Sequence, residues 1–411
     1  MNNTLNIAFT KHEWYFIFMF VFLFFQAILE RLSVYFSLSD EFFSLFGLYI
    51  FLFRSKYKYV FSNYPLVKTI FKAVYVIISL GIISSFKYKI QHSLIVNLLD
   101  LFSFVKFFVL FFFSLWLLEK CRISKTLHAI YVLVCIYLIV GFIFMLISQF
   151  VDIGMVFEKR YGLNAYMFIN PNPGDYSSIL IISLVIVHVY SYFSGRACLF
   201  LKLIACILIV STFRGKALGF ILTYFFLLYY VYKLGNLNVK SLLFLALIAI
   251  AGGYMQIRYY FVDNVTPRSL FFLYGFITAN EYFPLGAGFG SFGSNMAKIH
   301  YSSLYSEYGF GNIYGMGKEE SLFLNDNFWP MIMGQYGWIG CMLFLFVVYT
   351  LFKIVCTHIH AKNLKIAGFS LFFLLLYSSV GGPIFVHYIG CISVVVFSLV
   401  MCVNTKCSCR T

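Results

Sequence analysis

The sequence predicts an all-α polytopic membrane protein, because its composition is too apolar for a chain that folds in water. Hydrophobic residues make up 62% of the 411 residues and charged residues only 11%, with a mean hydropathy of +0.89. Soluble domains are about half apolar and about a quarter charged. Apolar runs long enough to cross a bilayer alternate with short polar segments, so residues 1–411 are expected to form a single membrane domain.

About twelve apolar segments are expected to be transmembrane helices, although several are shorter than the ~20 residues that a perpendicular helix needs. The first begins at Trp14 and is expected to act as an uncleaved signal anchor. The segments 42–53 and 366–382 have the softest boundaries. The predicted spans are residues 14–29, 42–53, 73–86, 101–118, 129–150, 176–193, 197–212, 217–232, 241–256, 328–352, 366–382 and 385–403.

The distribution of charge predicts the orientation of these spans. Twelve spans place both termini on one side, and the connections and tails of that side hold 17 of the 30 Lys and Arg residues, including the cluster from Arg54 to Lys72, against two acidic residues. The opposite side holds 11 basic and 13 acidic residues, and only Lys106 and Lys202 lie within spans, near their ends. Positively charged connections stay in the cytoplasm. Both termini are therefore expected to be cytoplasmic, in the inner membrane of a bacterial cell.

Neither nucleic acid nor a metal is an expected partner. The net charge of +15 comes from short Lys and Arg clusters between apolar runs rather than from a long basic stripe. Most of the ten cysteines lie inside apolar runs, where Cys serves as a small hydrophobic residue. Cys407 and Cys409 have no His or further Cys at metal-ligand spacing, so we expect no disulfide framework, metal or cofactor.

The predicted outer, periplasmic face carries the unusual sequence. A large loop covers residues 257–327 and is far longer than an ordinary connection, while a smaller loop covers residues 151–175. A third connection is the tight turn Ser211–Lys216, which contains the pattern S-x-x-R-G. Within the large loop, the apolar stretch Ser269–Ile277 is expected to form a re-entrant or interfacial helix.

Three arginines on this face are candidates for binding an anionic ligand. Arg214 lies in the tight turn, and Arg258 and Arg268 open the large loop. A guanidinium group offers a planar fork for phosphate oxygens, and the neighbouring Gly215 permits close backbone approach. The alternative is that all three anchor the chain at the membrane interface, where Arg is common.

The rest of the large loop combines glycines, aromatic rings and carboxylates. The run Pro284–Gly293 contains G-x-G-x-G, which is either a phosphate-binding loop or a tight turn against the membrane; the Lys-Ser/Thr of a nucleotide loop is missing. The segment Tyr301–Gly309 follows, and Glu319, Glu320 and Asp326 lie further on. Rings with carboxylates suit sugars, whose C–H faces stack and whose hydroxyls need hydrogen bonds. An ordinary solvated loop is the alternative.

Four short patches on this face resemble the O-antigen polymerase and ligase superfamily. They are Asn170-Pro171-Asn172, S-x-x-R-G at 211–215, Arg268 followed by Pro284-Leu-Gly-Ala-Gly-Phe-Gly, and Asn325-Asp326-Asn327 leading into Gln335-Tyr-Gly-Trp-Ile-Gly. Ligases of the superfamily typically carry a His-Asn pair before the span that corresponds to Phe328–Gly340. Here Asp326 and Asn327 occupy that position, so the resemblance favours a repeat-unit polymerase of the Wzy type.

The resemblance implies a fold similar to the membrane-embedded C-type glycosyltransferases. It also implies a metal-independent reaction in which glycan is transferred from undecaprenyl pyrophosphate to a lipid-linked repeat unit. The expected partners are the lipid bilayer, a chain-length regulator and a flippase. Arg214 and Arg268 would stabilise the departing pyrophosphate, and Asp326 would act as the base or orient the acceptor, unless it merely caps the next helix. The implied substrate contacts are Arg258, Asn172, Gly288, Tyr305, Glu307 and Asn327.

Three other classes remain open: a ligase-type glycan transferase, a flippase or transporter for lipid-linked oligosaccharides, and a purely structural membrane component. A flippase is expected to concentrate ionisable residues within its spans. The sequence places only Lys106 and Lys202 there and puts most polar residues in the outer loop. This distribution favours the polymerase.

Overall fold

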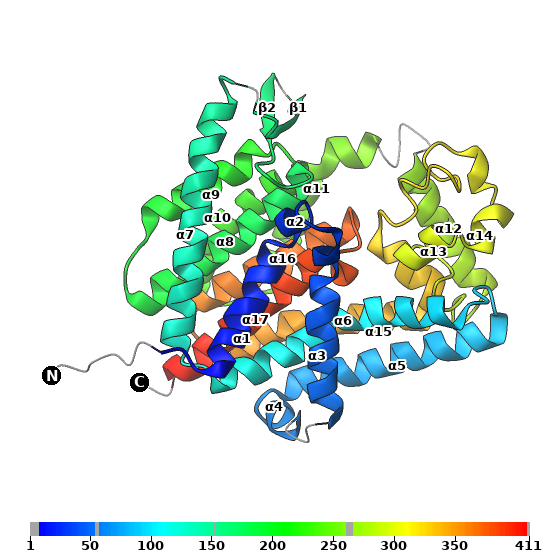
Figure 1. Cartoon of the computed structure of the whole chain (residues 1–411), viewed down its shortest axis with the longest axis horizontal. Coiled ribbons are helices and arrows are strands. Elements are labelled where there is room, and N and C mark those ends of the chain that lie inside the picture. The colour runs from blue at the N-terminus through cyan, green and yellow to red at the C-terminus, as the bar shows by residue number, and fades with distance from the viewer. Residues whose placement is uncertain (1–7, 54–56, 152, 161, 260–265, 409–411) are drawn as a thin grey trace.

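The computed structural model of the chain describes residues 8–53, 57–151, 153–160, 162–259 and 266–408, and it is almost entirely helical (Figure 1). Arg54, Lys56, Cys409 and Arg410 lie outside the described residues. The longer helices are α1 (Lys11–Phe24), α3 (Ser39–Phe53), α5 (Pro65–Tyr88), α6 (Leu94–Lys120), α7 (Ile123–Ser148), α8 (Pro173–Ser194), α9 (Leu199–Ser211), α10 (Gly215–Leu234), α11 (Val239–Arg258), α12 (Pro267–Glu281), α15 (Phe328–His358), α16 (Lys362–Val380) and α17 (Tyr388–Ser408).

Short elements connect these helices. The helical ones are α2 (Gln26–Leu29), η1 (Val34–Leu38), α4 (Tyr57–Asn63), α13 (Asn295–Ile299), α14 (Ser303–Glu307), η3 (Phe310–Asn312) and η4 (Ile384–Val386). The smaller outer loop contains an antiparallel hairpin of β1 (Val156–Arg160) and β2 (Leu163–Tyr166). The all-α prediction did not anticipate this hairpin.

Among the described residues, nine helices are long and apolar enough to cross a membrane. They are α3 together with η1, and α5, α6, α7, α8, α10, α15, α16 and α17. The prediction of a polytopic α-helical membrane protein is therefore confirmed. Of the other three predicted spans, α1 has 14 residues, α9 has 13 and α11 has 20. The count of twelve spans stays a prediction.

Several helix boundaries differ from those predicted, for local reasons. Helix α1 ends at Phe24, and a break at Phe25 (φ −99°, ψ 9°) separates it from α2, so the predicted span 14–29 is interrupted. Helix α5 begins at Pro65, a residue that favours the first helical turn. Helix α6 begins at Leu94 rather than near 101, and the hydroxyl of Ser93 accepts a hydrogen bond from the N–H of Val96.

Hydrogen bonds between helix ends define two faces of the bundle. One, here called the terminal face, gathers residues that the charge bias predicts to be cytoplasmic. The bonds that define it are Arg122 Nε to Glu13 Oε1 (2.8 Å), Lys406 Nζ to Leu118 O (3.0 Å), Asn404 Nδ2 to His358 O (2.8 Å) and Lys362 Nζ to Tyr232 O (2.8 Å).

The opposite face, here called the loop face, carries the two outer loops. The bonds that define it are Arg31 Nη2 to Asn170 O (3.1 Å), Lys216 Nζ to Ser178 Oγ (3.1 Å) and Trp329 Nε1 to Ser379 Oγ (3.1 Å). The alternation of helix ends between the two faces agrees with the predicted connectivity, whereas the cytoplasmic assignment of the terminal face rests on charge alone.

Helices α6 and α17 form the centre of the bundle. In the apolar stretch of α17 that is long enough to cross a membrane, 94% of the residues are buried. In the corresponding stretches of the peripheral helices α5 and α7 the share is 33%. The buried side of α6 is a row of phenylalanines, Phe107, Phe108, Phe111 and Phe112 among them. Peripheral helices turn apolar side chains outward, as lipid requires of a spanning helix.

The large outer loop folds around a hydrophobic core of its own. Its fully buried members include Phe271 of α12, Tyr305 of α14 and Met316. Helix α12 contains the predicted apolar helix Ser269–Ile277 and packs along α15. In Figure 1 this segment, with α12, α13 and α14, stands to one side of the helical bundle.

The Gly-rich run 284–293 fixes this loop to the spans. Helix α15 breaks at Gly337 (φ 63°, ψ −166°), and the run enters the break: Ala287 N donates to Gly334 O (2.8 Å) and Gly288 N to Gln335 O (2.9 Å). A Cβ on Gly337 would lie 2.5 Å from Pro284 O, too close for any side chain. The contact supports the tight-turn interpretation of the glycines over the phosphate-loop one.

A topology experiment tests the orientation. Reporters fused near residue 300 and after the C-terminus should report opposite sides of the membrane, with the C-terminal one cytoplasmic, because positively charged connections stay inside. Paired alkaline phosphatase and fluorescent protein fusions supply the measurement. If both positions report the same side, the outer placement of residues 257–327 is wrong.

Substituting Gly286 tests the junction between loop and spans. Gly286 has φ +81° and its added Cβ would meet the backbone of Gln335, at 2.6 Å. Gly309→Ala is the matched control, because Gly309 has φ +68° but open space around it. Gly286→Ala should lower the free energy of unfolding by roughly 1–3 kcal/mol more than Gly309→Ala, from overpacking. Thermal unfolding in detergent measures the difference, and equal losses would show that the contact is not tight.

Candidate functional site

The structure pairs two of the predicted site residues at the membrane end of the outer loop. Arg268 lies in the first turn of α12, which Thr266 and Ser269 cap reciprocally, and its Nη2 donates to Asp326 Oδ2 at 3.1 Å. Both side chains are 30% exposed. Asp326 stands just before α15, so the pair lies where the loop meets a spanning helix. A cation and a carboxylate are thereby held together at a partly accessible point.

The surroundings of Asp326 tune its proton affinity. Burial raises the pKa of Asp326 above its ordinary value, while the positive charges of Arg268 and Lys298 oppose that rise. Lys298 of α13 is held near by a hydrogen bond from its Nζ to Asn325 Oδ1 (3.5 Å). A carboxylate with a raised pKa is a stronger base than an exposed one, and the two cations keep it ionised over a wider pH range.

The helix-cap interpretation of Asp326 is wrong, because Asn327 occupies the N-cap position of α15. Asn327 is buried, and with its amide oriented to donate it reaches Val380 O (3.0 Å) and Asp326 O (3.1 Å). The amide therefore ties the start of α15 to the end of α16. This is a structural contact rather than an exposed substrate contact.

Arg214 lies on the same face, in the predicted tight turn between α9 and α10. It occupies the N-cap position of α10, its Nη2 lies 3.9 Å from Glu158 Oε1, and its guanidinium lies 5.3 Å from the ring centre of Phe157. The β1–β2 hairpin thus supplies both partners. The hairpin and the α12–α14 segment, which carries Arg268, stand well apart in Figure 1.

Helix α16 lies between the helices that follow Arg214 and Asp326. On one flank, Tyr377 shares a hydrogen bond with Thr223 of α10 (2.7 Å); on the other, Ser379 accepts one from Trp329 of α15 (3.1 Å). The end of α16 on the loop face therefore lies between the helix that begins after Arg214 and the helix that follows Asp326. Of the two arginines expected to bind pyrophosphate, Arg268 contacts Asp326, whereas Arg214 contacts the hairpin.

Asn172 and Arg258 occupy helix ends on the loop face. The side chain of Asn172 caps α8: its Oδ1 accepts from Asp175 N (2.8 Å) and its Nδ2 donates to Asp175 Oδ2 (2.8 Å). Lys216, in the first turn of α10, reaches across to Ser178 of α8 and adds a second cation beside Arg214. Arg258 is the exposed last residue of α11.

Two predicted substrate contacts are packing residues. Gly288 is buried with φ +89°, and a Cβ there would lie 2.6 Å from Ser85 Oγ of α5. Tyr305 is fully buried, and its hydroxyl accepts a hydrogen bond from Gly293 N at 2.8 Å. These contacts correct the expectation that both face a ligand. Glu307, at the end of α14, is exposed.

A buried charge cluster inside the spans was not predicted. Nζ of Lys106 lies 2.5 Å from Asp40 Oδ2 and 2.6 Å from Glu41 Oε1, and Gln26 Nε2 donates to Asp40 Oδ1 at 2.9 Å. The expectation that Lys106 lies near the end of its span is wrong, because α6 begins at Leu94. Lys106 therefore lies well away from the ends of α6, and its ammonium group needs the two carboxylates of α3 as partners.

A second buried acid holds the Gly-rich run. Asp100 of α6 is 4% exposed, and its Oδ2 accepts hydrogen bonds from Gly290 N (2.7 Å) and Gln335 Nε2 (2.8 Å). The acid thus joins α6, the outer loop and α15 at one point. Within the part of the chain that the structure describes, no three His, Cys, Asp or Glu side chains are arranged to hold a metal ion.

Comparison with known proteins adds no relative to this picture. No protein-family model matches the chain, and no curated protein matches it.

Replacing Lys106 tests the buried charge cluster. Lys106→Met should lower the free energy of unfolding by about 3–5 kcal/mol, because it leaves two carboxylates in the bundle without their cation. Adding Asp40→Asn and Glu41→Gln removes those charges and should restore much of the loss. Thermal unfolding in detergent is the measurement.

The control is Lys202→Met, since the ammonium of Lys202 makes a hydrogen bond to Ser191 (3.0 Å) at the terminal face. This variant should lose far less stability than Lys106→Met. Comparable losses would mean that the cluster contributes nothing particular to stability.

Proposed function

We propose that the chain is a repeat-unit polymerase for O-antigen or another surface polysaccharide, with a fold related to the C-type glycosyltransferases. It would transfer glycan from undecaprenyl pyrophosphate to a lipid-linked repeat unit at the outer face of the inner membrane. The observation that supports this most is the contact between Arg268 and Asp326 (3.1 Å) at the membrane end of the outer loop. In this proposal Arg268 would bind phosphate and Asp326 would act as the base, side by side where two lipid-anchored substrates would meet.

The reaction needs few parts from the protein. The acceptor hydroxyl oxygen attacks the anomeric carbon of the donor glycan, a new C–O bond forms, and the C–O bond to the pyrophosphate breaks. Asp326 takes the hydroxyl proton, and the pyrophosphate leaves with its charge stabilised by Arg268. The glycosyl–pyrophosphate bond already stores the energy, so the remaining requirement is orientation. Arg stays charged at any working pH.

Two separate arginine subsites fit two lipid-linked substrates, because donor and acceptor each carry a pyrophosphate. Arg268 would bind the pyrophosphate of the donor beside Asp326. Arg214, with Lys216 beside it, would bind the pyrophosphate of the acceptor. The end of α16 would lie between these two subsites. A flippase would deliver repeat units to this face, and a chain-length regulator would set the length of the product.

A transporter for lipid-linked oligosaccharides is the second candidate, favoured by the cluster of Lys106, Asp40 and Glu41 within the spans. Lys106 contacts both carboxylates, at 2.5 and 2.6 Å, and a purely structural cluster would do the same. A ligase is disfavoured by Asp326, which stands where ligases have His.

The surface polysaccharide of a deletion strain separates these functions. Single repeat units attached to their final acceptor indicate a lost polymerase. Absence of surface polymer with long lipid-linked chains accumulating indicates a ligase. Repeat units retained in the cytoplasmic leaflet indicate a flippase.

Substitutions at the Arg268–Asp326 pair should lower the rate of polymerisation without loss of protein. Asp326→Asn should lower the rate by roughly 100- to 10,000-fold, which is the contribution of a general base. Arg268→Lys and Arg214→Lys should also impair the reaction, because Lys keeps the charge but loses the bidentate fork. Chain formation by each variant in the deletion strain, at matched protein levels, is the measurement.

Glu281→Gln is the control, an acid at the other end of α12 that accepts a hydrogen bond from Tyr308 (2.7 Å). It should polymerise normally. Full-length polymer from Asp326→Asn would remove this residue from the mechanism.

The pH profile tests the role of Asp326 as the base. The rate should fall as pH drops through the pKa of Asp326, which burial holds above its ordinary value. Arg268→Gln removes a positive charge that lowers this pKa, so the acidic limb should move to higher pH. Arg268→Lys keeps the charge and should leave the limb in place. The measurement is the polymerisation rate of the wild type and of each variant in reconstituted vesicles as a function of pH. An acidic limb at the same pH in Arg268→Gln as in the wild type would contradict the assignment of Asp326 as the base.

A further inference from the structure

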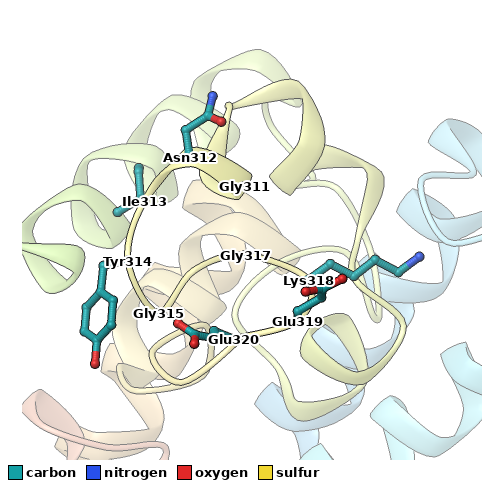
Figure 2. A pocket seen from close by; sticks show the side chains of 9 residues that line it. All are labelled: Gly311, Asn312, Ile313, Tyr314, Gly315, Gly317, Lys318, Glu319 and Glu320. Atoms are coloured by element: carbon teal, nitrogen blue, oxygen red, sulfur yellow. The ribbon is translucent and has the colours of Figure 1, made fainter.

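Residues 311–320 of the outer loop turn around a hollow of about 440 Å³ (Figure 2). This volume lies in the range of small-ligand sites, roughly 300–1,000 Å³. Three glycines and Ile313 contribute to its wall, and the polar side chains that line it are Asn312, Tyr314, Lys318, Glu319 and Glu320. The lining therefore offers an amide, a phenol ring, an ammonium and two carboxylates within one short segment.

The turn that surrounds the hollow is anchored to the hydrophobic core of the loop. Met316 lies inside this segment and is fully buried in the hydrophobic core of the loop, with Phe310 before it and Leu324 after it. The N–H of Phe323 donates to Gly315 O at 2.9 Å and closes the turn. A site that is formed before its ligand arrives loses less conformational freedom on binding.

The rim is accessible and chemically mixed. Tyr314 is 73% exposed, and Lys318, Glu319 and Glu320 are exposed as well. In Figure 2, Tyr314 extends from the left of the turn, Asn312 points up from its top, and Lys318 extends to the right. An open aromatic face, with hydrogen-bond donors and acceptors on other residues of the same turn, suits a sugar, whose C–H face stacks on the ring while its hydroxyls are bonded.

The hollow is joined to the Arg268–Asp326 pair by a short backbone path. Gly315 is bonded to Phe323, and Phe323 O in turn accepts from Asp326 N at 3.3 Å. The charges differ between the two places. One Lys and two Glu give the hollow a net negative charge, which repels pyrophosphate and acidic sugars, whereas the pair offers a cation.

We propose that residues 311–320 bind the saccharide part of a lipid-linked substrate, and that this saccharide is neutral or carries amino groups. The proposal deepens the polymerase function and rests on it. The pyrophosphate end lies at Arg268, and sugar rings beyond the reacting one extend along Phe323 into the hollow. The hollow would thereby select which repeat unit is polymerised.

Binding to the purified protein tests the site without requiring turnover. The probe is the oligosaccharide released by mild acid from the undecaprenyl-linked repeat units of the strain, observed by saturation-transfer NMR. The double variant Tyr314→Ala, Glu320→Gln should bind it on the order of tenfold more weakly, from one lost stacking contact and one weakened hydrogen bond. The same oligosaccharide with its primary hydroxyls oxidised to carboxylates should bind the wild type more weakly than the parent.

Tyr35→Ala is the matched control, because Tyr35 of η1 is 85% exposed on the loop face but remote in sequence from the hollow. Unchanged binding by the double variant overturns the site, and so does a loss of equal size in Tyr35→Ala. Equal or tighter binding of the oxidised probe overturns the charge selection.

Turnover in reconstituted vesicles separates this proposal from the function on which it rests. If the wild type extends chains, the double variant should raise the KM for lipid-linked repeat units about tenfold and keep kcat, in contrast to Asp326→Asn. An unchanged KM overturns the site while the polymerase stands. If the wild type extends nothing, the polymerase function fails, and the binding measurement alone decides the site.

Discussion

The insertion of the Gly-rich run into the break of α15 is the contact on which the rest of the outer face depends. Backbone hydrogen bonds such as Gly288 N to Gln335 O (2.9 Å), which only close backbone approach allows, join the loop to α15. On α5, the hydroxyl of Ser85 accepts a hydrogen bond from Phe289 N (2.9 Å). Asp100 completes the junction from inside the bundle. With this junction fixed, α12 packs along α15, and Arg268 and Asp326 meet at the membrane end of the loop. The glycines therefore position the site rather than bind the substrate.

The bilayer imposes the second constraint, because polar groups inside it must find partners within the protein. Lys106 is paired with Asp40 and Glu41, and Asp100 accepts hydrogen bonds from two donors, so ionisable side chains occur within the spans without indicating transport by themselves. The less buried pair of Arg268 and Asp326, at 30% exposure, is different in kind. Its partners are accessible to a ligand, which is what a reaction at the membrane surface requires.

The sequence was sufficient for the features that depend on local composition. Apolar runs predict spans, and nine helices of spanning length are present among the described residues; the turn that carries Arg214 also lies where the sequence puts it. Other features depend on distant partners. Asp100 is hydrogen-bonded to residues 190 and 235 positions away, so its burial could not be inferred from neighbouring residues. The burial of Gly288 and Tyr305 and the placement of Arg214 against the hairpin follow from such tertiary contacts as well.

The central claim is that this chain alone joins lipid-linked repeat units on the loop face. Reconstitution of the purified protein into vesicles with undecaprenyl pyrophosphate-linked repeat units, without nucleotide, tests it most directly. The account predicts a ladder of products that grow by one repeat unit, and its loss in Asp326→Asn. Repeat units that stay single in the presence of folded wild-type protein would contradict it.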